Sequence, residues 1–183
     1  KYAGIGASIV ACIKNTRTPF SIDFGVGDVI VPKQEKRKIP TQLDDFTVPM
    51  VNTYSLETTI AEKIDAILSL MEFSSRMKDY YDIYYLASKF DFDGKMLTEA
   101  LAKTFNNREH AFTIEQFEQV MSFANDSAMQ KKWKAFCRKI DTKTDNFSAV
   151  LKIINVFLAK PFAAVAMSKD FAEKWSAADA KWM

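Results

Sequence analysis

The sequence predicts an α+β fold in which a short β part precedes a larger helical part. Residues 5–26 are rich in β-branched and alternating apolar residues, whereas apolar residues recur about every 3.6 positions from Tyr54 onward. Only five Gly and five Pro occur among 183 residues, beside 15 Phe and eight Met, and this composition favours a helix-rich core. A chain of this length buries enough surface to fold without a disulfide or a metal ion.

The β part begins with an apolar run at residues 5–13, which predicts a buried strand. Residues 20–26 alternate, so Phe20 is expected on one face and Asp23 on the opposite face. Asp23 is then either a solvent-facing carboxylate on a one-sided sheet or a ligand-binding group. Three further segments complete this part: a short strand at 29–32, a solvated charged loop at 33–38 and an extended or irregular stretch at 39–53.

Helical periodicity continues from there to the end of the chain. Ser55 is expected to cap the first helix, and Thr113 is expected to form a capping box with Gln116. The predicted helices cover 56–71, 76–89, a segment that includes 98–106, 114–124, 127–140 and 145–159, the last ending near Pro161, with a helical or frayed tail at 168–183.

Composition excludes several classes of protein. The net charge of +2 argues against a strong nucleic-acid footprint from bulk charge. Cys12 and Cys137 stand far apart and are predicted to be reduced, mostly buried thiols. There is no signal peptide, and no apolar run approaches the roughly 20 residues of a membrane span. We therefore expect a cytoplasmic protein without a membrane contact.

Charged residues stand on the apolar faces of the first two predicted helices. On a helical wheel, Lys63 lies among the apolar side chains of the first helix and Glu57 lies beside them, whereas Glu62 and Asp65 fall on the polar side. In the second helix, Asp79 lies within the apolar arc. A lone buried ion costs several kcal/mol, so these positions need a partner or a purpose.

Two explanations remain open at this point. Lys63 forms an ion pair with Asp79 or Glu57 that fixes how two helices pack, or these groups belong to a functional site. Asp82 stands at the edge of the apolar arc, four residues after Lys78, and that spacing predicts a surface ion pair.

Three segments stand in a recognisable order: FSIDFGVGDVIVP, YSLETTIAEKIDAI and RMKDYYDIYYL. With the weaker TFNNREHAF and KKWKAFCRK, they resemble the AbiEii/AbiGii family of nucleotidyltransferase-like toxins across most of the chain. The resemblance implies a polymerase-β-like core with a mixed sheet, of which residues 1–53 are the C-terminal portion, followed by a helical domain at 54–183. It also implies transfer of a nucleotide from an NTP to an acceptor, tRNA in some members, in toxin–antitoxin or phage-defence systems, with Mg²⁺ bound and an antitoxin as partner.

The resemblance implies roles for seven charged residues. They are Lys63, Asp79 and Asp82 for catalysis, Glu57, Arg76 and Lys78 for nucleotide binding, and Asp23 for the metal ion. Phosphoryl transfer depends mainly on positioning and charge neutralisation, so a lysine at the rim of a cleft can neutralise the triphosphate. Asp79 would orient that lysine or act as a base toward the acceptor hydroxyl.

The chain departs from the family pattern in one respect. It contains no Gly-Ser and Asp-x-Asp motif, the pair that holds phosphates and metal in the family. Because the chain begins at Lys1, we expect a truncated chain or a degenerate member that is inactive alone. The alternative function is a catalytically silent helical interaction module.

One predicted helix, at 127–140, is strongly basic. Its cations predict either a solvated face or a patch for RNA phosphates: Lys131, Lys132, Lys134, Arg138 and Lys139. The single histidine, His110, is expected at the surface or in a loop. An aromatic series at helical spacing is expected in the core: Trp133, Phe136, Phe147 and Phe157.

Overall fold

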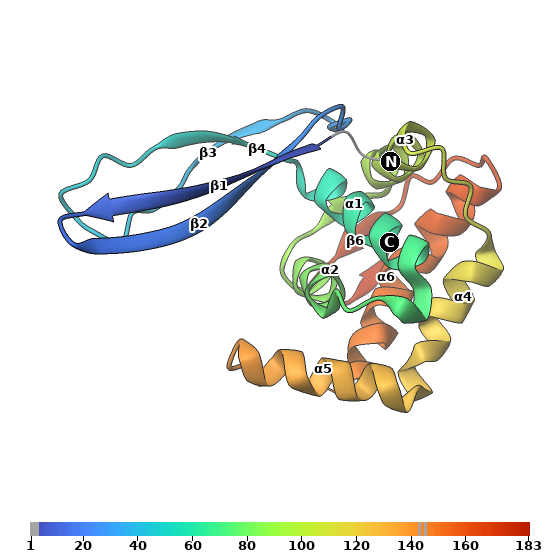
Figure 1. The fold of residues 1–183 in the computed structure, drawn as a ribbon. Coiled ribbons are helices and arrows are strands. Elements are labelled where there is room, and N and C mark those ends of the chain that lie inside the picture. Colours follow the sequence, from blue (N-terminus) through green and yellow to red (C-terminus); the bar gives the residue numbers. More distant parts are fainter. Residues whose placement is uncertain (1–3, 143, 145) are drawn as a thin grey trace.

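The computed structural model describes residues 4–142, 144 and 146–183. Its elements confirm the α+β class, because an arm of two β-hairpins extends from one side of a helical body (Figure 1). All strand pairs between described residues are antiparallel. The described residues up to 53 therefore form two antiparallel hairpins and not the mixed sheet that the resemblance implied.

The longer hairpin of the arm has one apolar and one polar face. Strands β1 (Gly4–Ile13) and β2 (Thr16–Gly25) pair over their whole length, with Ile9 opposite Phe20. The predicted strand at 5–13 is therefore confirmed, but its predicted burial is wrong. Its apolar side chains face solvent, and Phe20 is 43% exposed.

The shorter hairpin replaces the charged loop and part of the irregular stretch expected at 33–53. Strand β3 (Glu35–Lys38) pairs with β4 (Met50–Thr53), and Thr53 Oγ1 donates a hydrogen bond to the Glu35 carbonyl at 3.1 Å. Charged side chains do not exclude a strand here because the pair is solvated, and exposed edge strands often carry lysine.

The strand predicted at 29–32 is absent, because Val31 instead docks onto the start of the first helix. The Val31 side chain is 2% exposed, and its backbone N–H donates to Thr58 Oγ1 at 2.8 Å. The Val31 carbonyl accepts hydrogen bonds from the hydroxyls of Ser55 and Thr58. Ser55 also caps that helix as predicted, since its side chain accepts from the Thr58 N–H. These contacts join the arm to the helical body.

Most of the helical body follows the sequence prediction. The first two helices match within one residue, and Thr113 and Gln116 form the predicted capping box. The elements of the body before the C-terminal tail are α1 (Leu56–Leu70), η1 (Met71–Phe73), α2 (Met77–Lys89), β5 (Phe92–Asp93), α3 (Gly94–Asn107), α4 (Ile114–Ser122), η2 (Phe123–Asn125), α5 (Ser127–Lys139) and α6 (Phe147–Ala166).

Helix α6 continues past Pro161 to Ala166, so the predicted end near Pro161 is wrong. The predicted start at residue 145 lies outside the described residues. Proline has no N–H to donate to the carbonyl of Phe157, four residues earlier. In the structure the indole Nε1 of Trp182 donates to that carbonyl at 2.8 Å. The helix therefore continues because a tertiary contact replaces the missing backbone bond.

The C-terminal tail is neither helical nor frayed, which is a second correction. Strands β6 (Lys174–Ser176) and β7 (Lys181–Trp182) extend β5 into a three-stranded antiparallel sheet. Trp175 is 1% exposed, and its indole Nε1 donates to the carbonyl of Ala87 at 2.7 Å. Burial of two tryptophans, each with a satisfied N–H, holds the tail on the helical body.

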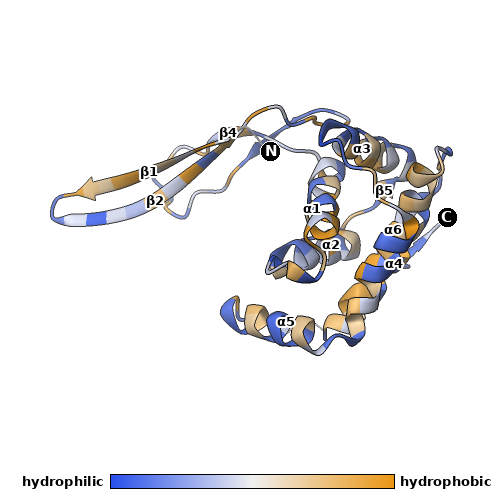
Figure 2. Ribbon diagram, turned by 45° about the vertical axis from the view of Figure 1, so that its right-hand side comes forward, coloured by the Kyte–Doolittle hydropathy of each residue, from blue (hydrophilic) through white to orange (hydrophobic). Residues whose placement is uncertain are grey.

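The core of the helical body contains the predicted aromatic residues. Trp133, Phe147 and Phe157 are at most 3% exposed, and Phe136 packs against this core at intermediate exposure. Among the described helices, α6 alone is long and apolar enough to cross a membrane, and much of it is coloured hydrophobic in Figure 2. Nine of its residues are buried in the core. A core helix meets the same criteria, so this match alone indicates no membrane span.

The two cysteines lie in different environments. Cys12 is exposed on β1, which corrects its predicted burial, and Cys137 on α5 is half-buried. Both are free thiols.

Candidate active site

The turn between α1 and α2 is fixed before the charged residues of α2 begin. Ser74 is fully buried, and its hydroxyl accepts a hydrogen bond from the Arg76 backbone N–H at 3.1 Å. Lys132 of α5 donates to the Ser74 carbonyl at 3.0 Å. Asp79 then falls in the first turn of α2, where the positive end of the helix dipole stabilises a carboxylate.

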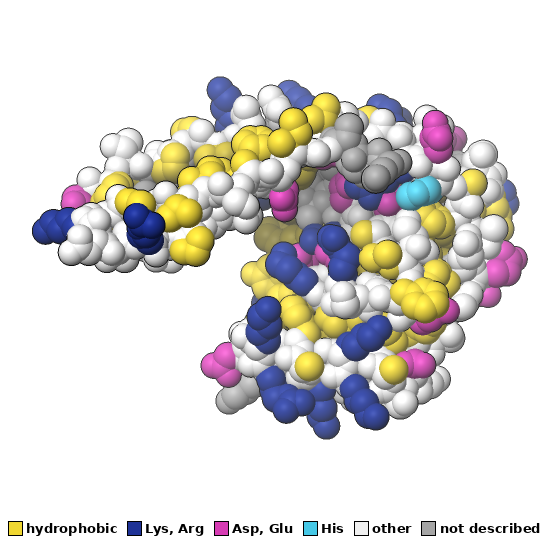
Figure 3. Space-filling model, viewed as in Figure 1, with side chains coloured by type: hydrophobic (Ala, Val, Ile, Leu, Met, Phe, Trp, Pro, Cys, Tyr) yellow, Lys and Arg dark blue, Asp and Glu magenta, His cyan; other side chains and the backbone are white. Residues whose placement is uncertain are grey.

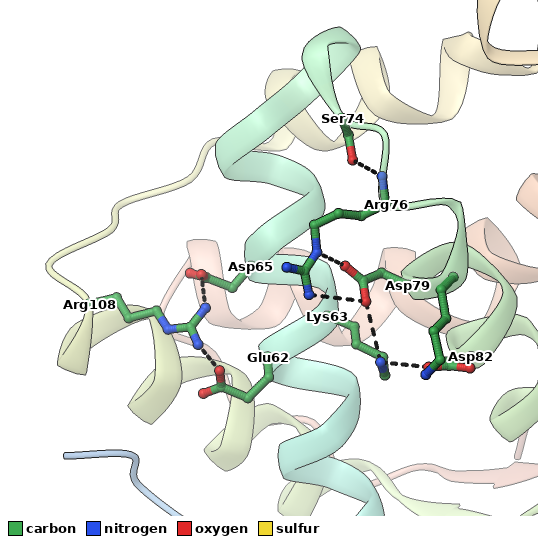
Figure 4. Close-up of polar contacts among 9 residues, drawn as sticks. Glu62, Lys63, Asp65, Ser74, Arg76, Asp79, Asp82 and Arg108 are labelled. Atoms are coloured by element: carbon green, nitrogen blue, oxygen red, sulfur yellow. Dashed lines mark hydrogen bonds and ion pairs between the residues drawn. The ribbon is translucent and has the colours of Figure 1, made fainter. Parts of the chain in front are cut away.

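Five charged side chains from α1 and the start of α2 form one ion-pair cluster (Figure 4). Lys63 Nζ lies 3.3 Å from Asp79 Oδ1 and 2.6 Å from Asp82 Oδ2. Arg76 Nε lies 2.5 Å from Asp79 Oδ2, and Lys78 Nζ lies 2.8 Å from Asp82 Oδ2. Lys63 thus has two carboxylate partners. The predicted ion pair of Lys78 with Asp82 is confirmed, and the Asp82 carboxylate also pairs with Lys63.

The centre of the cluster is held away from bulk solvent, whereas Arg76 and Lys78 at its edge are exposed. The Asp79 side chain is 4% exposed and that of Lys63 is 17% exposed. The hydrogen bond to Asp79 raises the pKa of Arg76. Burial favours the neutral form of Asp82, but hydrogen bonds from Lys63 and Lys78, together with their charges, lower its pKa below the ordinary value. Asp82 is therefore a carboxylate at neutral pH.

A cleft beside the cluster is lined by a small excess of cations. Its volume is about 460 Å³, within the range of roughly 300–1,000 Å³ that small-molecule sites have. Three cations line it against two carboxylates. The lining residues are Gly25, Asp28, Tyr54, Thr59, Glu62, Lys63, Ala66, Arg76 and Arg108. Cations held in a partly buried cleft attract phosphate more strongly than they would in open water.

The arm contributes Asp28 to this cleft. Asp28 Oδ2 accepts a hydrogen bond from the Tyr54 hydroxyl at 2.5 Å. Its Oδ1 is buried and has no hydrogen-bond partner among the described residues. A buried carboxylate oxygen without a donor is unfavourable, so this atom is suited to a ligand that is a cation or a hydrogen-bond donor.

Two residues assigned from the sequence lie elsewhere. Asp23 is exposed on the polar face of the β1–β2 hairpin, opposite Gly6, and is not among the residues that line the cleft. Glu57 is half-buried near the charges of Glu35 and Asp93, and burial raises its pKa. Neither carboxylate forms an ion pair with Lys63 in the described part of the chain.

Sequence reasoning missed a second charged group behind the cleft. Arg108 contacts both Glu62 and Asp65, and His110 Nδ1 lies 2.8 Å from Asp65 Oδ1. Asp65 is 1% exposed, although the wheel put it on the polar side of α1. Burial raises the pKa of Asp65, and the contact with His110 opposes that rise. The signal was present as Arg108 and His110 in TFNNREHAF, but only the packing of α3 against α1 brings the group together.

The described residues do not fit a complete Mg²⁺ site. Magnesium prefers oxygen ligands, chiefly carboxylates and waters. Asp79 and Asp82 are already neutralised by Lys63, Arg76 and Lys78. The part of the chain that the structure describes contains no group of three His, Cys, Asp or Glu residues suited to a metal ion. Among the buried carboxylate oxygens of the described residues, Asp28 Oδ1 is the one without a hydrogen-bond partner.

Comparison with known proteins bears directly on this site. A family model described as nucleotidyl transferase AbiEii toxin, type IV TA system, matches residues 1–163. Comparisons with curated proteins and with solved structures returned no significant match. The family match spans the arm, the cleft and helices α1 to α5, so it covers every residue of the ion-pair cluster. This chain therefore belongs to the AbiEii nucleotidyl transferase toxin family of type IV toxin–antitoxin systems.

Proposed function

We propose that the protein transfers a nucleotide from an NTP to the hydroxyl end of an RNA acceptor, with tRNA as the first candidate. The observation that carries the proposal is Lys63, which lines a cleft together with Arg76 and Arg108 while two carboxylates hold its ammonium group. Membership of the family supports nucleotidyl transfer, and the fixed cations support binding of a triphosphate.

The residues of the cluster have distinct roles in this proposal. Lys63 neutralises charge that develops on the phosphates, as a compact cation already held in place. Asp79 is a positioning residue, because its two oxygens are occupied by Lys63 and Arg76. Asp82 holds Lys63 in the same way, and Lys78 keeps Asp82 ionised. Arg76 lines the cleft and supplies further positive charge there, whereas Lys78 is not among the lining residues.

The metal ion and part of the nucleotide site require additional carboxylates. We propose that they come from strands carrying Gly-Ser and Asp-x-Asp motifs, which pack against the exposed apolar face of the β1–β2 hairpin. Most of the exposed large apolar side chains of this hairpin lie on one face, which supports that arrangement. Asp28 is the candidate from this chain for a ligand to the metal ion that nucleotidyl transferases use, because its buried Oδ1 has no partner among the described residues. Asp23, the ligand expected from the sequence, lies on the polar face of the hairpin and outside the cleft, so it does not fit that role.

The proposal is tested with full-length protein, Mg²⁺, each labelled NTP in turn and total tRNA. We expect the label to join the RNA with at least one nucleotide. Lys63→Gln should lower the rate by roughly 100-fold or more, because a fixed charge that stabilises the transition state is lost. Transfer is measured as label retained on RNA after electrophoresis.

The matched control is Lys89→Gln, an exposed lysine at the far end of α2. It should leave both the transfer rate and the melting temperature unchanged. Absence of label transfer with all four nucleotides, or normal transfer by Lys63→Gln, would contradict the proposal. Absent transfer with intact partner binding would favour the alternative, a catalytically silent interaction module.

The family bears on the partner of this toxin, whereas its location is part of our proposal. Type IV toxin–antitoxin membership implies an antitoxin partner. We further propose that the toxin acts in the cytoplasm as part of phage defence, because an RNA acceptor and NTP are both found there.

A further inference from the structure

Helix α5 presents a row of cations that the proposed chemistry does not use. Residues 127–139 contain no Asp or Glu. Lys131, Lys134 and Arg138 follow one another at intervals of three and four residues, so they form one stripe along the helix. At about 1.5 Å per residue the stripe extends roughly 10 Å. We call these three residues the α5 stripe.

The α5 stripe is exposed and carries uncompensated charge. All three side chains are exposed, and none of them forms an ion pair with another described residue. Lys132, on a different face, is used structurally, because it donates to the carbonyls of Glu72 and Ser74 at 3.0 Å. Lys132 is thus engaged in the packing of α5, whereas the three side chains of the α5 stripe remain exposed to solvent.

Those same contacts attach α5 to the turn that precedes the ion-pair cluster. Lys132 bonds to the turn that immediately precedes Arg76, and Phe136 packs on Tyr81 of α2 with ring centroids 5.8 Å apart. Figure 3 shows Lys and Arg side chains gathered over α5 and again at the hollow between the arm and the helical body. A polyanion long enough to reach from α5 to this hollow would therefore meet basic side chains in both regions.

A cavity beside the stripe adds neutral polar groups. It has a volume of about 600 Å³ and lies between α5 and the start of α6. Lys131 and Lys134 line it, together with Gln130 and Asn146. Cations at regular spacing beside uncharged hydrogen-bonding side chains suit a backbone of repeated phosphates and sugars better than a single small anion.

We propose that the α5 stripe binds the phosphate backbone of the RNA acceptor and directs its hydroxyl end into the cleft at Lys63. This inference rests on the proposed function for the identity of the acceptor. The contacts are to phosphates, so they contribute affinity and orientation and little sequence preference.

The test is a binding titration of the full chain with fluorescently labelled tRNA, without nucleotide, at several salt concentrations. In the triple variant Lys131→Gln, Lys134→Gln, Arg138→Gln, we expect Kd to rise by roughly tenfold or more. The slope of log K against log salt should fall by about two to three, since each lost phosphate contact reduces it by nearly one.

The matched control removes three exposed lysines from other faces: Lys95→Gln, Lys152→Gln and Lys169→Gln. It has the same net charge as the test variant and should retain nearly wild-type affinity and slope. Equal losses in both variants, or no loss in the α5 variant, would overturn the inference. Stripe-dependent binding to anionic lipid vesicles without binding to RNA would overturn it as well.

Binding and transfer are separate readouts here. Stripe-dependent RNA binding without label transfer would overturn the proposed function and support the α5 interface. Label transfer by the triple variant at wild-type efficiency and wild-type KM for RNA would overturn the interface and support the proposed function.

Discussion

At the scale of single residues, Asp82 links the ion-pair cluster to the stability of the fold. Lys63 and Lys78 both bond to Oδ2 of this carboxylate, at 2.6 and 2.8 Å. They lower the pKa of Asp82 in the folded chain. A group whose pKa is lower in the folded than in the unfolded state stabilises the fold above its unfolded pKa, and this contribution is lost as the pH falls through the folded value.

We therefore predict that Asp82→Asn reduces the free energy of unfolding at pH 7 by about 1 kcal/mol, the upper range for partly exposed ion pairs. The difference from the wild type should be constant down to about pH 5 and should shrink below about pH 4, where the wild type also loses the charge. Urea unfolding at pH 7, 5 and 3.5 measures this. Asp170→Asn, at an exposed position without an ion pair in the described chain, should show no such pH dependence. A difference that grows in acid would contradict the prediction.

The residues of the cluster could largely be found from the sequence, whereas those behind the cleft could not. A wheel identifies Lys63 and Asp79 because each stands among apolar neighbours of its own helix. Asp65 shows no such conflict, since a wheel considers one helix at a time. Its burial comes from Arg108, 43 residues later in the chain. Asp28 was likewise overlooked, because the folding of the arm against α1 brings it to the cleft.

At the scale of elements, α6 shows how a tertiary contact overrides a local signal. Pro161 predicts a helix end, and the proline does remove one backbone hydrogen bond. The indole of Trp182 takes that place on the carbonyl of Phe157, and its ring stacks on Phe157 with centroids 5.8 Å apart. Burial of Trp182 also explains why the tail forms a strand pair, because a frayed tail would expose the indole ring of Trp182 to water.

This arrangement predicts a coupling between positions 161 and 182. Trp182→Phe should destabilise the protein by about 1–3 kcal/mol, since a buried carbonyl loses its donor. In a Pro161→Ala background, the restored N–H of residue 161 can bond to that carbonyl. The same Trp182→Phe change should then cost about 1 kcal/mol less. Chemical denaturation of the four variants gives the coupling energy, and strict additivity would show that the indole does not serve this carbonyl.

Elements whose signals are local were predicted well, and elements set by distant contacts were not. Helices α1 and α2 carry their own periodicity, and the cap at Ser55 is local. Strand β3 is a charged segment whose only strand signal is its partner, 12 or more residues later. The composition of residues 29–32 predicts a strand, yet the backbone N–H and carbonyl of Val31 bond to the Thr58 side chain of α1 instead.

At the scale of the whole molecule, the arm and the helical body differ in how they are stabilised. The body has a buried core, whereas the apolar face of the β1–β2 hairpin is open to solvent. Ile9, Phe20 and Phe24 lie on this face at 38%, 43% and 53% exposure. Such a face is typical of an interface with another segment or chain.

Substituting these three residues by threonine should therefore leave the helical body intact while it removes association through the arm. We expect the melting temperature to change by no more than a few degrees, because exposed substitutions alter stability by roughly 0.5 kcal/mol or less each. Concentration-dependent association in sedimentation experiments should decrease. Ser8→Thr with Ser21→Thr, on the polar face of the same hairpin, serves as the control. A collapse of the melting transition in the triple variant would show that this face is part of the core.

The hydrogen bonds between Val31 and the start of α1 connect the position of the arm to the position of that helix. Thr58 receives the arm, and Lys63 stands five residues further along the same rigid helix. A partner that binds the arm is therefore connected, through Val31 and helix α1, to the ammonium group of Lys63. A partner need not reach the cleft to disturb it, since tilting the arm against α1 would move Asp28 away from the cleft that Lys63 lines. The joint at Val31 is therefore the place where binding of a partner far from the cleft can be converted into a change of its shape.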